Sequence, residues 1–306
     1  MSGDSSKPDI ERLLDTDEEN SKHSLSNMVA FDPRLPEALD DVAAMFNTFA
    51  RCMDGSQDER PALDRLSEIA RELNLSNEDL AQRALGDGDE DDALIVEAKA
   101  QMDRLRARQV MDMLSLAVQR HYLWAATDIR RLRRTAAMLY LRVEVEAVGL
   151  LCLLRKDPSV AKAWTHMKTE EDGRAFHRQY NRKVLEQLEA VELLSAYNAA
   201  SGSAQHMRLA SLVHGVKVDD GRERRVTTVN LPEWQRDRPH DFLNWLLWFL
   251  RTQERVFRAL LVAYPDAHDP VFIERVRLLE KLISSLYQTL KDKFPAECAQ
   301  WAAMGS

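Results

Sequence analysis

The chain has 306 residues, of which 45% are hydrophobic and 30% charged, and its formal net charge is −8 at pH 7. This hydrophobic content is normal for a protein that buries a core, and the length allows one large or two moderate domains. Glycine and proline are scarce, at 10 residues each, while residues that favour helices are plentiful. The composition therefore favours an all-α fold, a multi-helix bundle, over a β-sandwich or a β-barrel.

The charge is unevenly distributed along the chain. Residues 1–97 carry 25 acidic and 9 basic side chains, whereas residues 98–306 carry 25 acidic and 33 basic ones. The second part alone is basic, which allows an anionic partner there. The acidic first part would shield that surface or keep the protein soluble. Ordinary solvated helix faces are the alternative interpretation.

No feature of the sequence indicates export or a membrane. The N-terminus lacks the apolar region of a signal peptide, and no stretch reaches about 18 uninterrupted apolar residues. The cysteines, Cys52, Cys152 and Cys298, lie far apart and indicate neither a disulfide framework nor a CxxC metal site. We therefore expect a cytoplasmic protein that makes no contact with membranes.

The first third of the chain is predicted to hold two regions. Residues 1–36 are acidic and poor in large apolar residues, which predicts a disordered arm whose "IERLL" segment binds an unknown protein partner. Residues 37–91 are predicted to form a small helical region, with one helix ending at Gly55 and two short helices after it. The segment "GDGDEDD" has no glycine or glutamate where a calcium loop needs them, so it is interpreted as a linker.

Residues 92–306 are predicted to form the main helical bundle. Residues 92–156 contain no proline and one glycine, and we expect two antiparallel helices with a break near "QRHYLW". A short helix follows Asp157-Pro158 and closes at "TEEDGR", another spans 175–200, and two amphipathic helices form the C-terminal part. Alternation around Asp220-Gly221 predicts a surface loop or small hairpin at 215–238.

Two clusters of arginines lie on the predicted central helices. "DRLRAR" covers 103–108, and "DIRRLRR" contains Arg130, Arg131, Arg133 and Arg134. Arginine suits bidentate contacts with phosphate, so the second cluster is a candidate RNA-binding surface. The alternative is that about half of these arginines pair with neighbouring acids.

Other residues in apolar helices have mainly structural interpretations. One of Glu144 and Glu146 is expected to point inward and to need an arginine partner such as Arg142. Phe242, Trp245, Trp248 and Phe249 form an aromatic stripe, which indicates core or a subunit interface more than a ligand pocket.

Motifs for metal and nucleotide chemistry are missing. The chain has no Glu-x-x-His, no His-Glu-x-x-His, no Walker loop and no Gly-x-Gly-x-x-Gly fingerprint. We therefore expect no metal site and no cofactor.

One segment, "HMRLASLVHG", combines groups suited to acid–base chemistry. On a helix, Arg208, Ser211 and His214 follow at intervals of three residues, and Arg208 and His214 share a face only loosely. Histidine titrates near neutrality and arginine does not, so the pair suits proton transfer beside a phosphate. The alternative is a helix end, with His214 bonded to the last carbonyls and Gly215 as the stop.

The spacing of Arg208 and His214 resembles the Arg-x4-6-His motif of the HEPN (higher eukaryotes and prokaryotes nucleotide-binding) superfamily. That resemblance implies a helical, metal-independent endoribonuclease acting as a dimer, with His214 as general base or acid, Arg208 stabilising phosphate charge and Ser211 orienting one of them. The order of residues from about 125 to 216 also resembles uncharacterised bacterial helical families with an Arg- and Glu-bearing helix, an Asp-Pro break and a late Ser/His-Gly segment.

Two functions remain open at this point. The first is a non-catalytic helical scaffold or interaction protein of unknown pathway that self-associates through apolar helices as a homo-oligomer. The second is a HEPN-like RNA-binding protein or ribonuclease that uses Arg208, Ser211 and His214.

Overall fold

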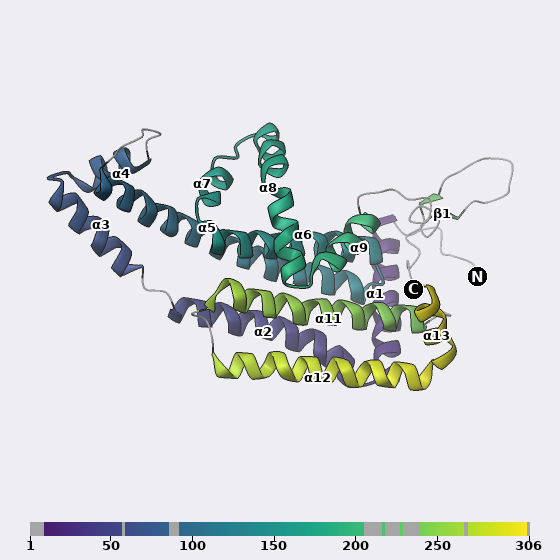
Figure 1. The fold of residues 1–306 in the computed structure, drawn as a ribbon. Helices are drawn as coiled ribbons and strands as arrows, with labels where there is room; N and C mark the ends of the chain where they lie inside the picture. Colours follow the sequence, from purple (N-terminus) through teal and green to yellow (C-terminus); the bar gives the residue numbers. More distant parts are fainter. Residues whose placement is uncertain are drawn as a thin grey trace.

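A computed structural model of the chain describes residues 9–56, 59–85, 92–204, 216–217, 227–228, 239–265 and 269–304. Twelve helices and one pair of two-residue strands lie in these ranges (Figure 1), which confirms the expected all-α bundle. In chain order they are α1 (Asp9–Phe31), α2 (Arg34–Ser56), α3 (Arg60–Glu72), α4 (Asn77–Leu85), α5 (Ala93–Arg130), α6 (Arg134–Lys156), α7 (Val160–Thr165), α8 (Glu170–Ala190), α9 (Leu194–Ala204), β1 (Val216–Lys217), β2 (Thr227–Thr228), α11 (Pro239–Ala263), α12 (Pro270–Lys293) and α13 (Pro295–Met304).

The main core lies between α2, the C-terminal half of α5, α6, α11 and α12. These helices run side by side in Figure 1 and bury one continuous apolar cluster. Aromatic rings from distant segments meet in it: Phe46 lies 4.6 Å from Phe257 and 5.3 Å from Tyr122 between ring centroids. Trp245 and Phe249 belong to this core, and Trp248 packs against it, as the interpretation of the stripe as core expects.

A long helical hairpin forms the centre of the molecule. Asp92 caps α5 by accepting a hydrogen bond from the Leu94 backbone N–H, and the helix then runs without interruption to Arg130. The prediction of a break near "QRHYLW" is wrong. The helix continues through this segment, and Tyr122 within it is fully buried in the core. The chain turns instead at Leu132, whose φ is 58°, where the Arg133 N–H bonds back to the Asp128 carbonyl at 2.8 Å.

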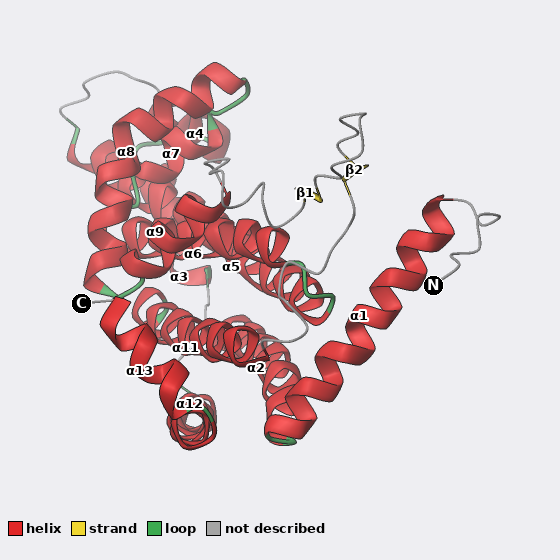
Figure 2. Cartoon of the chain, turned by 90° about the vertical axis from the view of Figure 1, so that its right-hand side faces the viewer, coloured by secondary structure: helices red, strands yellow, loops and turns green. Residues whose placement is uncertain are grey.

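The first helix corrects the prediction of a disordered arm over 1–36. Residues 9–31 form α1, and α2 begins at Arg34; residues 1–8 lie outside the described part. The face of α1 that packs inward is partly polar, since Asn20 and Ser24 are buried with Met28 and Phe31. The apolar periodicity of this segment is therefore weak, although α1 packs against the main core through Met28 and Phe31. Figure 2 shows α1 running away from the start of α2 at an angle.

The predicted region 37–91 does not form one unit. Helix α2 belongs to the main core, whereas α3 and α4 pack on the first turns of α5 and bury a separate small cluster that includes Ile69, Leu80 and Ile95. Arg65 of α3 holds this lobe to α5 through two hydrogen bonds to Glu97 at 2.7 and 2.8 Å. The lobe lies at one end of the molecule in Figure 1, so α5 is shared by two cores.

Two helix boundaries after α6 differ from expectation. "TEEDGR" opens α8 rather than closing α7, because Thr169 and Asp172 form a reciprocal capping box. The helix expected over 175–200 is divided into α8 and α9 at Glu192, whose φ is 58°. In the segment predicted as a loop or small hairpin, β1 and β2 pair antiparallel with Val216 opposite Thr228.

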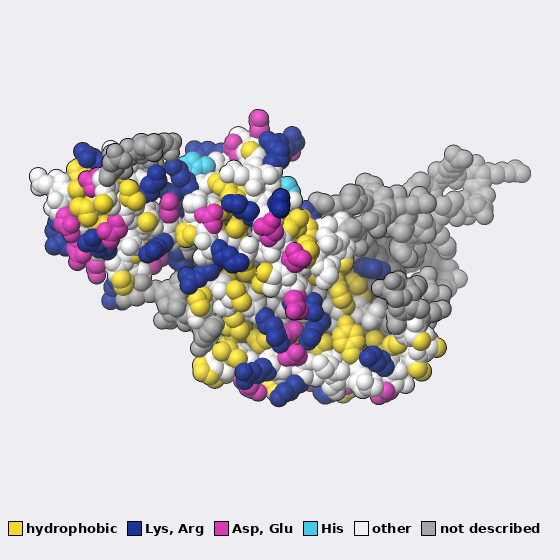
Figure 3. Space-filling view, in the orientation of Figure 1, with side chains coloured by type: hydrophobic (Ala, Val, Ile, Leu, Met, Phe, Trp, Pro, Cys, Tyr) yellow, Lys and Arg dark blue, Asp and Glu magenta, His cyan; other side chains and the backbone are white. Residues whose placement is uncertain are grey.

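The outer face of α11 and α12 carries paired charges. Glu254 is almost fully buried and contacts Arg258 and Arg251, and both arginines also contact Glu280 of α12. Figure 3 shows acidic and basic side chains gathered over these helices rather than one sign of charge. This surface is consequently balanced and serves to join the two helices.

Candidate anion-binding cavity

The residues of the HEPN-like motif lie outside the described part of the chain. Arg208, Ser211 and His214 all lie in 205–215, outside the described residues. Their role as a catalytic group remains a prediction, as does the alternative of a helix end.

The candidate RNA surface lies at the turn between α5 and α6 and is partly neutralised. Arg130 forms an ion pair with Asp40 of α2 at 2.6 Å, and Arg133 forms one with Asp17 of α1 at 2.5 Å. No ion pair links Arg131 or Arg134 to another residue that the structure describes. Acidic residues of α1 and α2 therefore neutralise part of the basic cluster. These partners, Asp17 and Asp40, are distant in sequence from the arginines.

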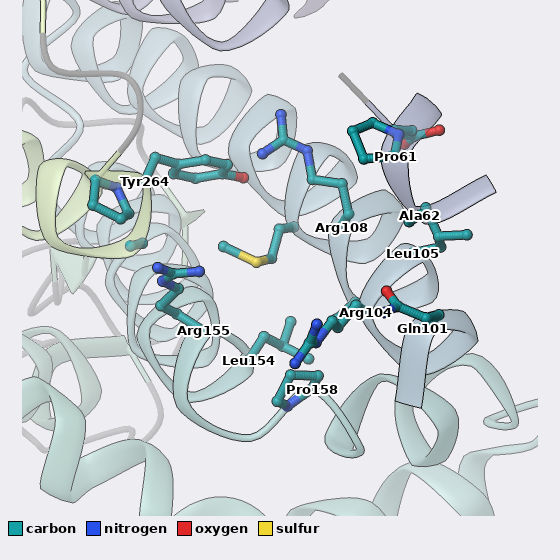
Figure 4. A pocket seen from close by; sticks show the side chains of 15 residues that line it. Pro61, Ala62, Gln101, Arg104, Leu105, Arg108, Leu154, Arg155, Pro158 and Tyr264 are labelled. Atoms are coloured by element: carbon teal, nitrogen blue, oxygen red, sulfur yellow. The ribbon is translucent and has the colours of Figure 1, made fainter. Parts of the chain in front are cut away.

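A different group of arginines surrounds a cavity of about 520 Å³. The cavity lies where the α3–α4 lobe meets the main bundle, and its wall comes from the start of α3, from α5, from the end of α6 and from the residues after α11. Arg104 and Arg108 enter it from α5 and Arg155 from the last turn of α6, with Tyr264 across from Leu105 (Figure 4).

The local sequence explains why one face of α5 lines this cavity. Helix α5 contributes residues 101, 104, 105, 107, 108 and 111 to the lining. Each of them lies three or four positions from at least one other, which places them on one side of the helix. Asp103, next to Arg104, forms an ion pair with Arg106 at 3.0 Å and does not neutralise Arg104. Arg104 therefore lines the cavity without a carboxylate partner from its own helix.

Arg108 is held in place by two neighbours. Its Nε donates to Asp112 at 3.2 Å, and its guanidinium lies over the Tyr264 ring, 5.1 Å from the centroid. The Tyr264 hydroxyl shares a hydrogen bond of 2.7 Å with Ser115, and burial raises the pKa of Tyr264 well above its ordinary value. Tyr264 is thus a fixed, neutral wall that orients Arg108 by a cation–π contact.

The described charged groups around the cavity are mainly basic. Arg104 and Arg155 form no ion pair with any residue that the structure describes, and among the described lining residues only Glu59 carries a carboxylate. Within the described part of the chain, three guanidinium groups thus face two carboxylates, those of Glu59 and of Asp112 on Arg108, and these five groups carry a charge of +1. Guanidinium groups bind carboxylates and phosphates through paired hydrogen bonds, so the arrangement suits an anion.

The sequence indicates part of this site. Arg104 and Arg108 lie in the "DRLRAR" cluster, whereas no motif contains Arg155 or Tyr264. Arg155 is a basic residue in the last turn of a helix, where such residues are common, and Tyr264 follows an apolar helix. A local pattern contains no signal that brings these four residues together.

The buried carboxylate predicted in α6 is Glu144, but its partner is not an arginine. Glu144 is fully buried, and its Oε2 accepts a hydrogen bond of 3.1 Å from Gln253 Nε2 of α11. Arg142 instead contacts Glu146, at 3.8 Å. With only an amide beside it, burial raises the pKa of Glu144 to about 8, so the side chain is mainly protonated and neutral at pH 7.

Comparisons with known proteins give this chain no relative: no protein-family model, no curated protein and no solved structure matches it. Within the described ranges, no helix is both long and apolar enough to cross a membrane. The same ranges contain no group of three or more His, Cys, Asp or Glu side chains placed to hold a metal ion.

Proposed function

We propose that this protein acts by binding, as a non-catalytic helical interaction protein whose arginine-lined cavity takes an anionic ligand. The observation that carries the proposal is the convergence of Arg104, Arg108 and Arg155 on one cavity of about 520 Å³. This volume lies within the range of roughly 300–1,000 Å³ that is usual for small-molecule sites.

Electrostatics supports this proposal. Arg104 and Arg155 are exposed, so solvent weakens their repulsion, but like charges that line one concave site still repel one another. An anion bound between Arg104 and Arg155 removes that repulsion and gains charge-assisted hydrogen bonds. The position at the junction of two cores is also typical of ligand sites.

Isothermal titration calorimetry with a panel of small anions tests the proposal. The panel holds inorganic phosphate, pyrophosphate, acetate, octanoate and phenyl phosphate at low ionic strength. We expect at least one to bind in a 1:1 ratio. In the double variant Arg104→Gln/Arg155→Gln the affinity should fall at least about 150-fold, since each of the two lost charge-assisted bonds is worth about 1.5–3 kcal/mol.

The matched control is Arg83→Gln/Arg178→Gln, which removes the same charge from two exposed arginines outside the cavity. It should bind the anion like the wild type. The proposal is wrong if no anion of the panel binds, or if both double variants lose affinity equally.

Self-association is a second property that one observation favours. Large apolar side chains remain 39–60% exposed on adjacent faces of the α5–α6 hairpin, where Trp124 lies 5.2 Å from Tyr140 between ring centroids; they are Met113, Leu116, Leu123, Trp124, Leu139 and Val143. Such a patch suits the same patch of a second copy. Light scattering after gel filtration should show a lower mass for Leu116→Glu, while the control Val262→Glu, exposed on α11, keeps the wild-type mass.

The HEPN-like ribonuclease remains the alternative function, with RNA as the partner. Its test is incubation with labelled RNA in EDTA, where cleavage by the wild type and not by His214→Ala supports it. A cytoplasmic location and a protein partner for the acidic N-terminal residues also remain proposals, and the free thiols of Cys52, Cys152 and Cys298 support a reducing compartment.

A further inference from the structure

The floor of the arginine-lined cavity is apolar. Leu154 and Met111 in its lining are almost fully buried, and the apolar lining residues that keep solvent-exposed surface are Pro61, Ala62, Leu105, Pro158 and Pro265. The Tyr264 ring closes one side with its hydroxyl engaged by Ser115. An inorganic ion held by Arg104 and Arg155 would leave this apolar surface uncovered.

We propose that the ligand is an amphiphilic anion, a small organic molecule with one carboxylate or monoester phosphate group and an apolar body. This inference rests on the anion-binding function proposed above and narrows its ligand class. The head group binds Arg104 and Arg155, and the body covers the partly exposed apolar residues Pro61, Leu105 and Pro158.

The charge of the cavity selects against polyanions. The charge of +1 on the described groups is neutralised by a single carboxylate, while a monoester phosphate, at about −1.5 to −2, exceeds it by less than one charge or by about one. A triphosphate would place excess negative charge near Glu59. Arg108 is already engaged by Asp112 and Tyr264, so it forms the wall of the site rather than a free second anion clamp.

A chain-length series measures the apolar contribution directly. Acetate, butyrate, hexanoate and octanoate share one head group, so only the body changes between them. We expect the affinity to rise about fourfold for each buried methylene until the cavity is filled. Hexyl phosphate is compared with hexanoate to distinguish a phosphate head group from a carboxylate.

Two variants separate the head group from the body. Arg104→Gln should weaken every member of the series by the same factor. Leu105→Gln should flatten the rise with chain length and leave the acetate affinity unchanged, because Leu105 contacts only the body. Leu105→Ala provides the same comparison if the glutamine variant does not fold, as judged by circular dichroism.

The two proposals fail in different ways. If affinity is independent of chain length, or if triphosphate binds more tightly than hexyl phosphate, while Arg104→Gln still weakens binding, the amphiphilic class is wrong and anion binding stands. If no member of the series and no inorganic anion binds, both are wrong.

Discussion

Replacing Glu144 by glutamine should stabilise the protein by an amount that grows with pH. Glu144 is fully buried at the contact between α6 and α11, and Gln253 is its hydrogen-bond partner. Neither Glu144 Oε1 nor Gln253 Oε1 has a hydrogen-bond partner within the described structure. Glutamine has nearly the same shape as glutamate. Its side-chain N–H group can donate a hydrogen bond, and these two oxygen atoms are acceptors without a donor.

The size of the effect follows from the pKa of Glu144. Burial raises it from its ordinary value of 4.5 to about 8, so the folded protein keeps a proton that the unfolded chain releases over this interval. The free energy of unfolding therefore falls as the pH rises through this window, by up to about 1.4 kcal/mol per pH unit. The loss relative to acid pH reaches about 3 kcal/mol at pH 7 and about 5 kcal/mol above pH 8.

Glu144→Gln removes this loss because glutamine does not titrate. Urea unfolding of the wild type and the variant at several pH values from 5 to 9 measures the difference, and other titrating groups cancel in it. We expect a difference below about 1 kcal/mol at pH 5, rising to about 3 kcal/mol at pH 7. In thermal unfolding the variant should melt about 6 °C higher at pH 7.

The control is Glu146→Gln, two residues away on the same helix, where the carboxylate is partly exposed and near Arg142. Its stability difference from the wild type should not increase from pH 5 to pH 8. A constant difference for Glu144→Gln across this range would show that Glu144 is ionised in the folded protein and would refute the reasoning.

Three further changes test local features of the fold by urea unfolding at pH 7. Gly149→Ala should destabilise by about 1–3 kcal/mol, because a Cβ there would lie 2.9 Å from side-chain atoms of α8, whereas Gly173→Ala, with nothing within 4 Å, should stabilise by about 0.5–1 kcal/mol; equal effects would contradict the close packing. Glu192→Gly should stabilise by about 0.5–1 kcal/mol because it relieves a φ of 58°, while Glu189→Gly, inside the helix, should cost about 1 kcal/mol. Thr169→Ala should cost about 1 kcal/mol by removing the cap of α8, and an unchanged midpoint would show that the cap adds nothing.

Helix ends show how far local information reaches. The starts of α5 and α12 were predictable, because Asp92 and Asp269 are caps whose side chains bond to the backbone two residues on. The turns at Leu132 and Glu192 were not, because neither residue favours a positive φ. These turns are selected by the helices they connect, which pack only when the chain reverses there.

The candidate site divides in the same way. The sequence by itself determined the apolar stripes that make the chain helical, and it placed Arg104 and Arg108 on one face of α5, since residues four apart lie one above the other. Only the tertiary structure decided that Arg155 and Tyr264 join them, and that Glu144 meets Gln253 rather than an arginine. Periodicity is encoded within a few turns of one helix, whereas these contacts depend on which helices pack together and in what register.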